Sequence, residues 1–242
     1  MANRSAVVAG VGPARGLGAA IARRFAREGF KITALGRNGE KLGEAVDEMR
    51  KTGGAVEAIV GDVTDEATVA RAVAAAEASA PLEVAVFNAG GNWPGAFLDV
   101  DGKRFESFWR VNALAGLFFG QAAIRTMLAR AKGTLIYTGA SASLRGRANF
   151  VAFASAKAAL RTVAQSAARE FGPKGIHVAH VVVDGAIDGE RVNTLIPTLK
   201  DQRGPDGLLD PDAIAENYWT LHQQQRSAWT HEIDVRPWVE NW

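Results

Sequence analysis

Short apolar runs rich in β-branched residues alternate with longer Ala-rich segments along the whole chain, and this alternation constrains the fold more than any other feature. Runs such as 84–87 and 178–183 are apolar almost throughout, which is typical of strands that helices cover on both faces. The longer segments carry Arg and Glu at helical spacing. Because strands that alternate with helices build parallel sheets, the pattern predicts an α/β protein.

The same pattern predicts one domain over residues 1–242, with a seven-stranded parallel sheet and helices on both faces, as in a Rossmann fold. Strands are expected at 5–9, 31–35, 55–60, 82–87, 133–138, 177–183 and 229–235. Helices are expected at 16–28, 40–51, 65–79, 102–131, 150–171 and 211–224. Gly and Pro cluster between 184 and 210, so we expect a long substrate loop there, and 226–242 is expected to form the last strand and a Trp-rich tail.

Composition argues against several classes of partner. The 28 Lys and Arg nearly balance the 26 Asp and Glu, so no basic patch for nucleic acid is indicated. Cysteine is absent, which excludes thiol nucleophiles and Cys-metal sites and suits a reducing compartment. The four histidines are scattered, with His177 and His180 expected on opposite faces of their strand, so no metal site is expected. No signal peptide or membrane span is expected, and the cytoplasm is the expected location.

A glycine-rich turn follows the first expected strand. Gly12, Gly16 and Gly18 precede an expected helix, with Arg15 and Leu17 between them. Glycines let the backbone approach a pyrophosphate closely, and the N–H groups and dipole of a helix N-terminus meet its charge. The alternative, an ordinary tight turn, would explain the glycines by themselves. The context of strand, turn and helix favours a dinucleotide site.

The residue after the second expected strand, Arg37, indicates which dinucleotide this site holds. NAD-binding Rossmann proteins place an acidic residue after the second strand, where it binds the ribose hydroxyls. Here the second strand leads into Gly36, Arg37 and Asn38, so the acid is missing. A 2′-phosphate needs cations, and Arg37 and Arg15 are the candidates. NADP(H) is therefore favoured over NAD(H), unless both arginines are merely solvated surface groups.

Several dispersed motifs, read together, resemble the short-chain dehydrogenase/reductase family over nearly the whole chain. The family's Gly-x-x-x-Gly-x-Gly turn matches Gly12, Gly16 and Gly18, its acidic residue after the third strand matches Asp62 beside Val63, and its Asn-Ala-Gly matches 88–90. The resemblance implies a nicotinamide cofactor. It assigns cofactor binding to Gly12, Arg15, Gly16, Leu17, Gly18, Arg37, Asp62, Val63, Asn88, Ala89, Gly90, Lys157, Gly185 and Ile187.

The family's catalytic tetrad of Asn, Ser, Tyr and Lys is only half present. Lys157 has Phe153 four residues before it instead of Tyr. Thirteen residues before Phe153 lies Ala140 instead of Ser, and 28 residues before that lies Asn112. In the family the Tyr hydroxyl passes the proton while a hydride moves, and Lys lowers the pKa of that Tyr and holds the ribose. A phenyl ring cannot pass a proton. Lys157 could still hydrogen-bond the nicotinamide ribose, and Asn112 could still position a backbone group or a water chain.

Other hydroxyls are candidates for the missing group. A local shift of one residue would place Ser141 beside the substrate oxygen, where its hydroxyl could polarise a carbonyl but would need water or Lys157 for the proton. Tyr137 belongs to a strand and is expected in the core. Tyr218 would reach the site only if its helix folded over the cleft.

Asp184 marks a further departure from the family. Where the family has Pro-Gly after the sixth strand, this chain has Asp184 and Gly185, and the backbone of Ile187 keeps its place near the nicotinamide. Asp184 is either a helper base or, as we favour, a turn former. Asp184 and Asp188 are also the only residues that favour a different reaction, such as isomerisation or dehydration.

Two functions are therefore weighed. The first is an NADP(H)-dependent oxidoreductase that acts on a small carbonyl or alcohol through an atypical site with Asn112, Ser141, Phe153 and Lys157. The second is a cofactor-binding sensor, scaffold or inactive subunit, which would explain Phe153 and Ala140 directly. The long helices 102–131 and 150–171 resemble those with which family members form dimers and tetramers, and aromatic residues on a tail can serve as subunit contacts. A homodimer or homotetramer is therefore expected. Trp93, Phe97, Phe150 and the loop 188–210 are expected to line an apolar substrate pocket. The tail's aromatic residues, expected to pack at the edge of the core or to contact another subunit, are Trp219, Trp229, Trp238 and Trp242.

Overall fold

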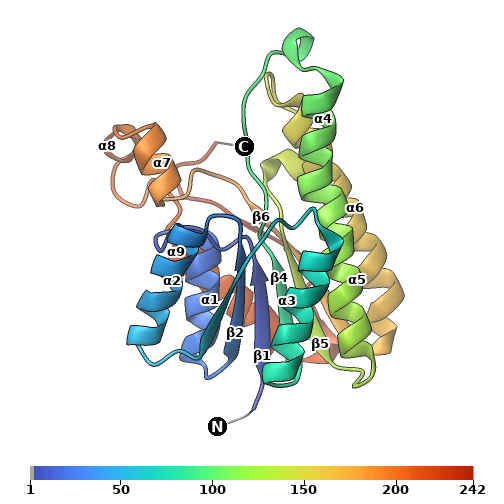
Figure 1. The fold of residues 1–242 in the computed structure, drawn as a ribbon. Coiled ribbons are helices and arrows are strands. Elements are labelled where there is room, and N and C mark those ends of the chain that lie inside the picture. Colours follow the sequence, from blue (N-terminus) through green and yellow to red (C-terminus); the bar gives the residue numbers. More distant parts are fainter. Residues whose placement is uncertain (1–2, 242) are drawn as a thin grey trace.

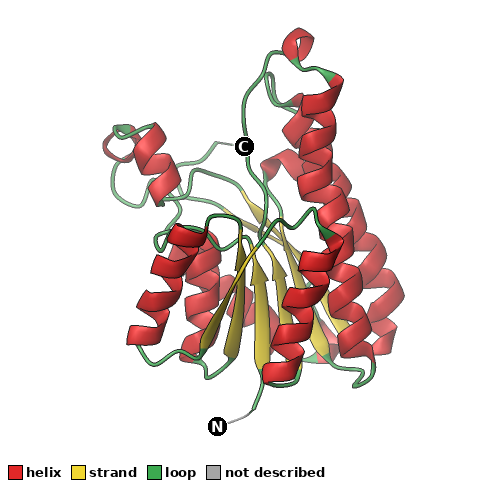
Figure 2. Cartoon of the chain, in the orientation of Figure 1, coloured by secondary structure: helices red, strands yellow, loops and turns green. Residues whose placement is uncertain are grey.

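The computed structural model describes residues 3–241, so Trp242 of the expected tail lies outside the described residues. One parallel sheet, drawn as yellow arrows in Figure 2, runs through the molecule. Its strand order is β3-β2-β1-β4-β5-β6-β7. Its strands are β1 (Ser5–Ala9), β2 (Lys31–Gly36), β3 (Val56–Val60), β4 (Leu82–Phe87), β5 (Gly133–Thr138), β6 (Ile176–Val183) and β7 (Glu232–Val235). The predicted fold class is confirmed.

Helices connect these strands in chain order. The α-helices are α1 (Leu17–Arg27), α2 (Gly39–Lys51), α3 (Glu66–Ser79), α4 (Gly102–Trp109), α5 (Ala115–Leu128), α6 (Val151–Phe171), α7 (Glu190–Leu195), α8 (Leu199–Arg203) and α9 (Pro211–Gln223). The short 3-10 helices are η1 (Phe97–Asp99), η3 (Ser141–Ser143), η4 (Gly172–Lys174) and η5 (Arg226–Ala228), and η2 (Arg110–Leu114) is a π-helical turn.

The sheet has a separate apolar core on each face. One core packs β1, β2 and β6 against α1, α2 and α9, and the other packs the same sheet against α3, α5 and α6. Figure 1 shows these two layers, with α7 and α8 beyond the carboxyl ends of the strands. Buried side chains such as Phe25 and Phe119 are shielded completely from solvent, and burial of a Phe side chain contributes about 2 kcal/mol.

Three predicted elements need correction. The expected helix 102–131 contains the π turn η2 and ends at Leu128, because Ala131 takes a left-handed φ of 47°. The expected loop 184–210 contains the short helices α7 and α8. The last strand begins at Glu232 instead of 229, because Trp229 stacks on the ring of His177 at 4.8 Å before strand pairing starts.

The stretch Gly102–Leu128 is also the one described helix whose length and composition would suffice to cross a membrane, with a mean hydropathy of 1.2 in its most apolar window. Half of that window is buried inside the protein. Burial of this kind is what a core helix of a folded domain shows, so the helix is weak evidence for a membrane span.

Candidate active site at the carboxyl edge of the sheet

The strand order reverses between β1 and β4, and open α/β sheets bind ligands at such a point. Gly10, after β1, has a φ of +89°, and a Cβ there would lie 2.5 Å from the backbone nitrogen of Ala89, after β4. A Cβ on Gly18 would lie 2.3 Å from the carbonyl oxygen of Gly10. The turn therefore needs glycine at both positions for close packing.

Gly10 is a glycine that this turn requires and that the sequence motifs did not single out. Gly12 has open space around the position of a Cβ, so the backbone packing does not require glycine there. The signal in the sequence was the place of Gly10 directly after β1. Helix α1 then begins after Gly16 without a side-chain cap and without an acidic residue in its first turn. Its N–H groups suit an anion.

Arg37 and Asp62 lie at the ends of β2 and β3. Their side chains are 3.9 Å apart, and the Arg37 side chain is 67% exposed. The Asp62 carboxylate accepts hydrogen bonds of 2.8 Å from the backbone nitrogen and hydroxyl of Thr64, which fix it beside the buried Val63. Asn88 braces the first turn, because its side-chain amide donates to the Gly10 carbonyl over 3.2 Å.

Arg15 contacts the segment that follows β6. Its guanidinium bonds the Asp188 carboxylate at 2.6 Å. Lys200 and Asn193 also donate to Asp188, each over 2.9 Å. Burial by itself would raise the pKa of Asp188, but these donors more than offset it and lower the pKa. Asp188 therefore ties α7 and α8 to the glycine turn.

Three predicted residues meet beside the end of β4. A Cβ on Gly90 would lie 2.7 Å from Asn112 Oδ1 and 3.3 Å from Lys157 Nζ. Asn112 sits on the π turn η2, a feature common at functional sites, and its Nδ2 donates to the Phe108 carbonyl over 2.9 Å. Asn112 Oδ1 is buried without a hydrogen-bond partner among the described residues.

Lys157 is the titratable group at the centre of this cluster. It is 5% exposed on α6, and its Nζ donates to the Thr138 carbonyl over 2.9 Å. Burial lowers the pKa of Lys157 to about 8, because the charged form loses its solvation. Phe153 lies one turn earlier on α6 and Ser141 begins η3, each partly buried. Perturbed and buried titratable groups of this kind are typical of functional sites.

The two tyrosines are structural. Tyr137 is buried in the core as expected, and its hydroxyl donates to the Gly116 carbonyl over 3.2 Å. Tyr218 is also fully buried, with its hydroxyl 2.7 Å from Thr138 Oγ1. Burial raises the pKa of both phenols, which leaves them poor proton donors.

Asp184 is buried at the end of β6 and lies 3.7 Å from Arg145 and 3.9 Å from Arg236. It is therefore paired with cations. Gly185 takes a φ of +152°, and Ile187 forms a β-bridge with Leu209 that anchors the loop. Within residues 3–241 no group of three or more His, Asp or Glu side chains is arranged to hold a metal ion.

Comparisons with known proteins agree with this geometry. The short chain dehydrogenase family model matches residues 6–198. The chain is 36% identical over 222 residues to 2,5-dichloro-2,5-cyclohexadiene-1,4-diol dehydrogenase LinX of Sphingobium indicum, covering 89% of this chain and 88% of the relative. It is 27% identical to an uncharacterised oxidoreductase of Staphylococcus aureus (strain USA300), over 98% of both chains.

Solved structures extend the likeness to the fold. A short-chain dehydrogenase from Rhodopseudomonas palustris superposes with a TM-score of 0.84 at 41% identity, over 98% of this chain and all of the other. A metagenomic short-chain oxidoreductase in complex with NADP gives a TM-score of 0.80 at 26% identity, over 98% of both chains. The chain therefore belongs to the short-chain dehydrogenase family of oxidoreductases.

Proposed function

We propose that this protein is an NADP(H)-dependent oxidoreductase that interconverts a small carbonyl compound and its alcohol. The observation that carries the proposal is the buried Lys157 amine beside Gly90 and Asn112, at the carboxyl edge where α/β folds bind ligands. The names of two similar proteins support it, since one is a diol dehydrogenase and the other was solved with NADP.

The residues present fit a nicotinamide cofactor. The glycine turn leaves room for a pyrophosphate before the uncapped N-terminus of α1. The unpartnered Asn112 Oδ1 and the Lys157 amine would hold the nicotinamide ribose end, and the backbone near Gly185 and Ile187 would face the ring. When bound, NADP(H) supplies or accepts the hydride.

The chain must supply the proton without a tyrosine. With a pKa of about 8, Lys157 is mostly protonated at neutral pH and still able to release its proton. Ser141, at the start of η3, would donate a hydrogen bond to the substrate oxygen, and Lys157 would hold the proton that the oxygen receives. Phe153 then shields the site and takes no part in proton transfer.

Arg37 carries the preference for NADP(H) over NAD(H). It is exposed beside Asp62, and no carboxylate at the end of β2 competes for the ribose. Titrations of NADPH and NADH into Arg37→Asp should show at least about tenfold weaker NADPH binding and little change for NADH. Arg27→Asp, at the exposed far end of α1, is the matched control. Equal weakening for both cofactors would overturn the preference.

Phe153 and Ala140 favour a second candidate, a cofactor-loaded binding protein without hydride transfer. An NADPH consumption assay against a broad panel of aldehydes and ketones separates the two. We expect wild type to consume NADPH with at least one carbonyl. If turnover appears only after Phe153→Tyr, the binding protein is the better description.

The cellular location and the oligomeric state complete the proposal. Members of the family are typically soluble, and we propose a cytoplasmic homodimer or homotetramer acting on a small molecule. Of the expected tail contacts, Trp219 packs on Phe25 and Trp229 on His177, whereas Trp238 is 79% exposed. Light scattering should give a mass above 25.6 kDa per particle, and a monomer would refute the oligomer.

A further inference from the structure

A partly buried polar network joins β6, β7 and α6. His180 on β6 is fully buried, and its Nδ1 is 2.9 Å from Glu232 Oε2 on β7. Glu232 in turn accepts a bidentate pair from Arg161 at 2.6 and 2.7 Å. Arg161 lies one helical turn after Lys157 on α6, so the network touches the helix that carries the active-site lysine.

The other ring nitrogen of His180 is unsatisfied. Nε2 is buried and has no hydrogen-bond partner among the described residues. It faces Gly139 so closely that a Cβ there would lie 2.2 Å away. The same Cβ position lies 3.0 Å from Ser143 Oγ, so the hydroxyl of Ser143 and Nε2 flank one glycine. An orphaned buried acceptor is costly and calls for a specific explanation.

The protonation state of His180 decides which partner it needs. Burial lowers the pKa of His180 to about 4, with Lys157 and Arg161 on α6 opposing its charge and Glu232 on β7 favouring it. The ring is therefore neutral at physiological pH. Because Nδ1 faces a carboxylate, the ring proton belongs on Nδ1, and Nε2 is left as an acceptor.

Ser143 offers the matching donor. Its oxygen accepts the backbone N–H of Ala140 over 3.2 Å, and no contact within residues 3–241 is seen to use its hydroxyl proton. Nε2 and the Ser143 hydroxyl make no contact here, but they flank the same glycine, and a turn of the Ser143 side chain about its Cα–Cβ bond would bring the hydroxyl to Nε2. The turn that these bonds would hold is η3, which begins at Ser141 directly after Ala140.

We propose that His180, held by Glu232 and Arg161, is a positioning residue that fixes the segment 139–143 through a hydrogen bond from Ser143. It thereby sets where the Ser141 hydroxyl stands relative to Lys157. This inference rests on the proposed function only for the role of Ser141 in turnover. The hydrogen bond itself is independent of cofactor and substrate.

Long-range ¹H–¹⁵N NMR of the imidazole, recorded on the full chain with and without NADPH, tests the bond directly. We expect the Nδ1–H tautomer and an Nε2 shift that moves toward that of a free acceptor in Ser143→Ala. The backbone amides of Ala140 and Ser141 should shift in the same variant. An Nε2–H tautomer, or imidazole signals that do not change in Ser143→Ala, would overturn the proposal even if no substrate is found.

Steady-state kinetics then distinguish a positioning role of His180 from a merely structural one. His180→Leu and Ser143→Ala should each lower kcat about tenfold or more with little change in NADPH affinity, and the double variant should add little. His180→Gln keeps an acceptor and should recover part of kcat. His177→Leu, on the same strand but against Trp229 and Thr230, is the matched control.

Additive losses, or an equal loss of kcat in His177→Leu, would contradict a positioning role. If His180→Leu does not fold, Ser143→Ala and His180→Gln still decide the matter. If wild type neither binds NADPH nor turns over any carbonyl, the proposed function fails, while the NMR result still tests the bond.

Discussion

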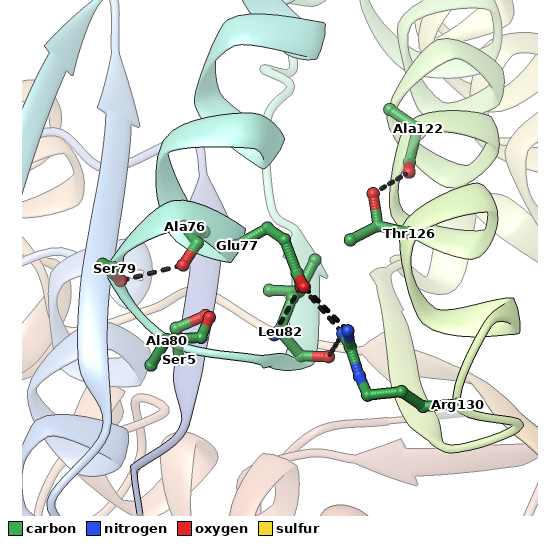
Figure 3. Close-up of polar contacts among 9 residues, drawn as sticks. All are labelled: Ser5, Ala76, Glu77, Ser79, Ala80, Leu82, Ala122, Thr126 and Arg130. Carbon is green, nitrogen blue, oxygen red and sulfur yellow. Dashed lines mark hydrogen bonds and ion pairs between the residues drawn. The ribbon is translucent and has the colours of Figure 1, made fainter.

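Two polar clusters, one at each edge of the sheet, differ in how completely their groups are paired. At the amino edge, Glu77 of α3 takes a bidentate pair from Arg130 at 2.7 and 2.8 Å and also accepts the Leu82 backbone N–H over 2.8 Å (Figure 3). Ser5 Oγ there donates to the Ala80 carbonyl over 2.9 Å. At the carboxyl edge, Asn112 Oδ1 and His180 Nε2 are buried without a partner among the described residues.

We interpret this difference as one between groups that stabilise the fold and groups that serve the proposed chemistry. The pKa of Glu77 is lowered chiefly by its hydrogen bond to Arg130, which marks a pair that stabilises the charged form. The pKa of Lys157 is lowered by burial, which marks a group whose charged form the fold destabilises. Unsatisfied and desolvated groups reduce stability, and proteins keep them mainly at functional sites.

Lys157→Met should have the largest effect and tests whether the carboxyl edge is catalytic. Methionine fills nearly the same space without an amine. If the carboxyl edge is a catalytic site, kcat/KM for carbonyl reduction should fall by about 10³-fold, because the variant loses a proton donor and a ribose contact. The melting temperature should stay level or rise, since a buried amine is removed. A large loss of stability with retained turnover would reverse the assignment of the two edges.

The pH dependence of the free energy of unfolding tests whether Lys157 is desolvated in the folded protein. Because the folded pKa of Lys157, about 8, lies below the ordinary lysine value of 10.5, the native state binds fewer protons than the unfolded state between these values. Wild-type stability should therefore gain up to about 3 kcal/mol from this group as the pH rises from 8 to 10.5. Lys157→Met should lack that gain in denaturant unfolding. Identical pH profiles would show that the lysine is not desolvated.

Gly18→Ala tests the glycine turn. The new Cβ would meet the Gly10 carbonyl at 2.3 Å, so the turn must open and the pyrophosphate site with it. NADPH affinity measured by fluorescence titration should fall by about ten- to a hundredfold. Gly43→Ala, on α2 outside the turn, is the matched control, because a Cβ there meets open space. Equal losses in both variants would show that packing at Gly18 does not control the site.

Arg130→Ala at the amino edge should have the smallest effect. The pair with Glu77 is partly exposed, so its removal should cost about 1 kcal/mol in the free energy of unfolding. NADPH affinity and kcat should not change. Any loss of cofactor binding in this variant would mean that the amino edge also contributes to the site.

The sequence allowed prediction of the fold and of the site's backbone frame. Four strand starts and the juxtaposition of Asn112, Gly90 and Lys157 follow from periodicity and family spacing, which are local signals. The sequence could not show that Arg15 bonds Asp188, 173 residues away, or that His180 faces Glu232, 52 residues away. Such contacts depend on tertiary packing, which neither spacing nor propensity encodes.

The π turn at Asn112 was also beyond prediction. Periodicity gave one helix over 102–131, and an inserted residue in the helical ladder leaves no mark in the apolar pattern. The role of Asn112, Ser141, Phe153 and Lys157 in turnover stays a prediction.

The most direct test of the account is a reaction with NADPH that carries deuterium at the transferable position of its nicotinamide. We predict that wild type yields an alcohol product with one deuterium from a carbonyl of the panel, detected by mass spectrometry, and that Lys157→Met yields almost none. If wild type binds the labelled cofactor but no deuterium reaches any product, the carboxyl edge is a binding site and not a catalytic one.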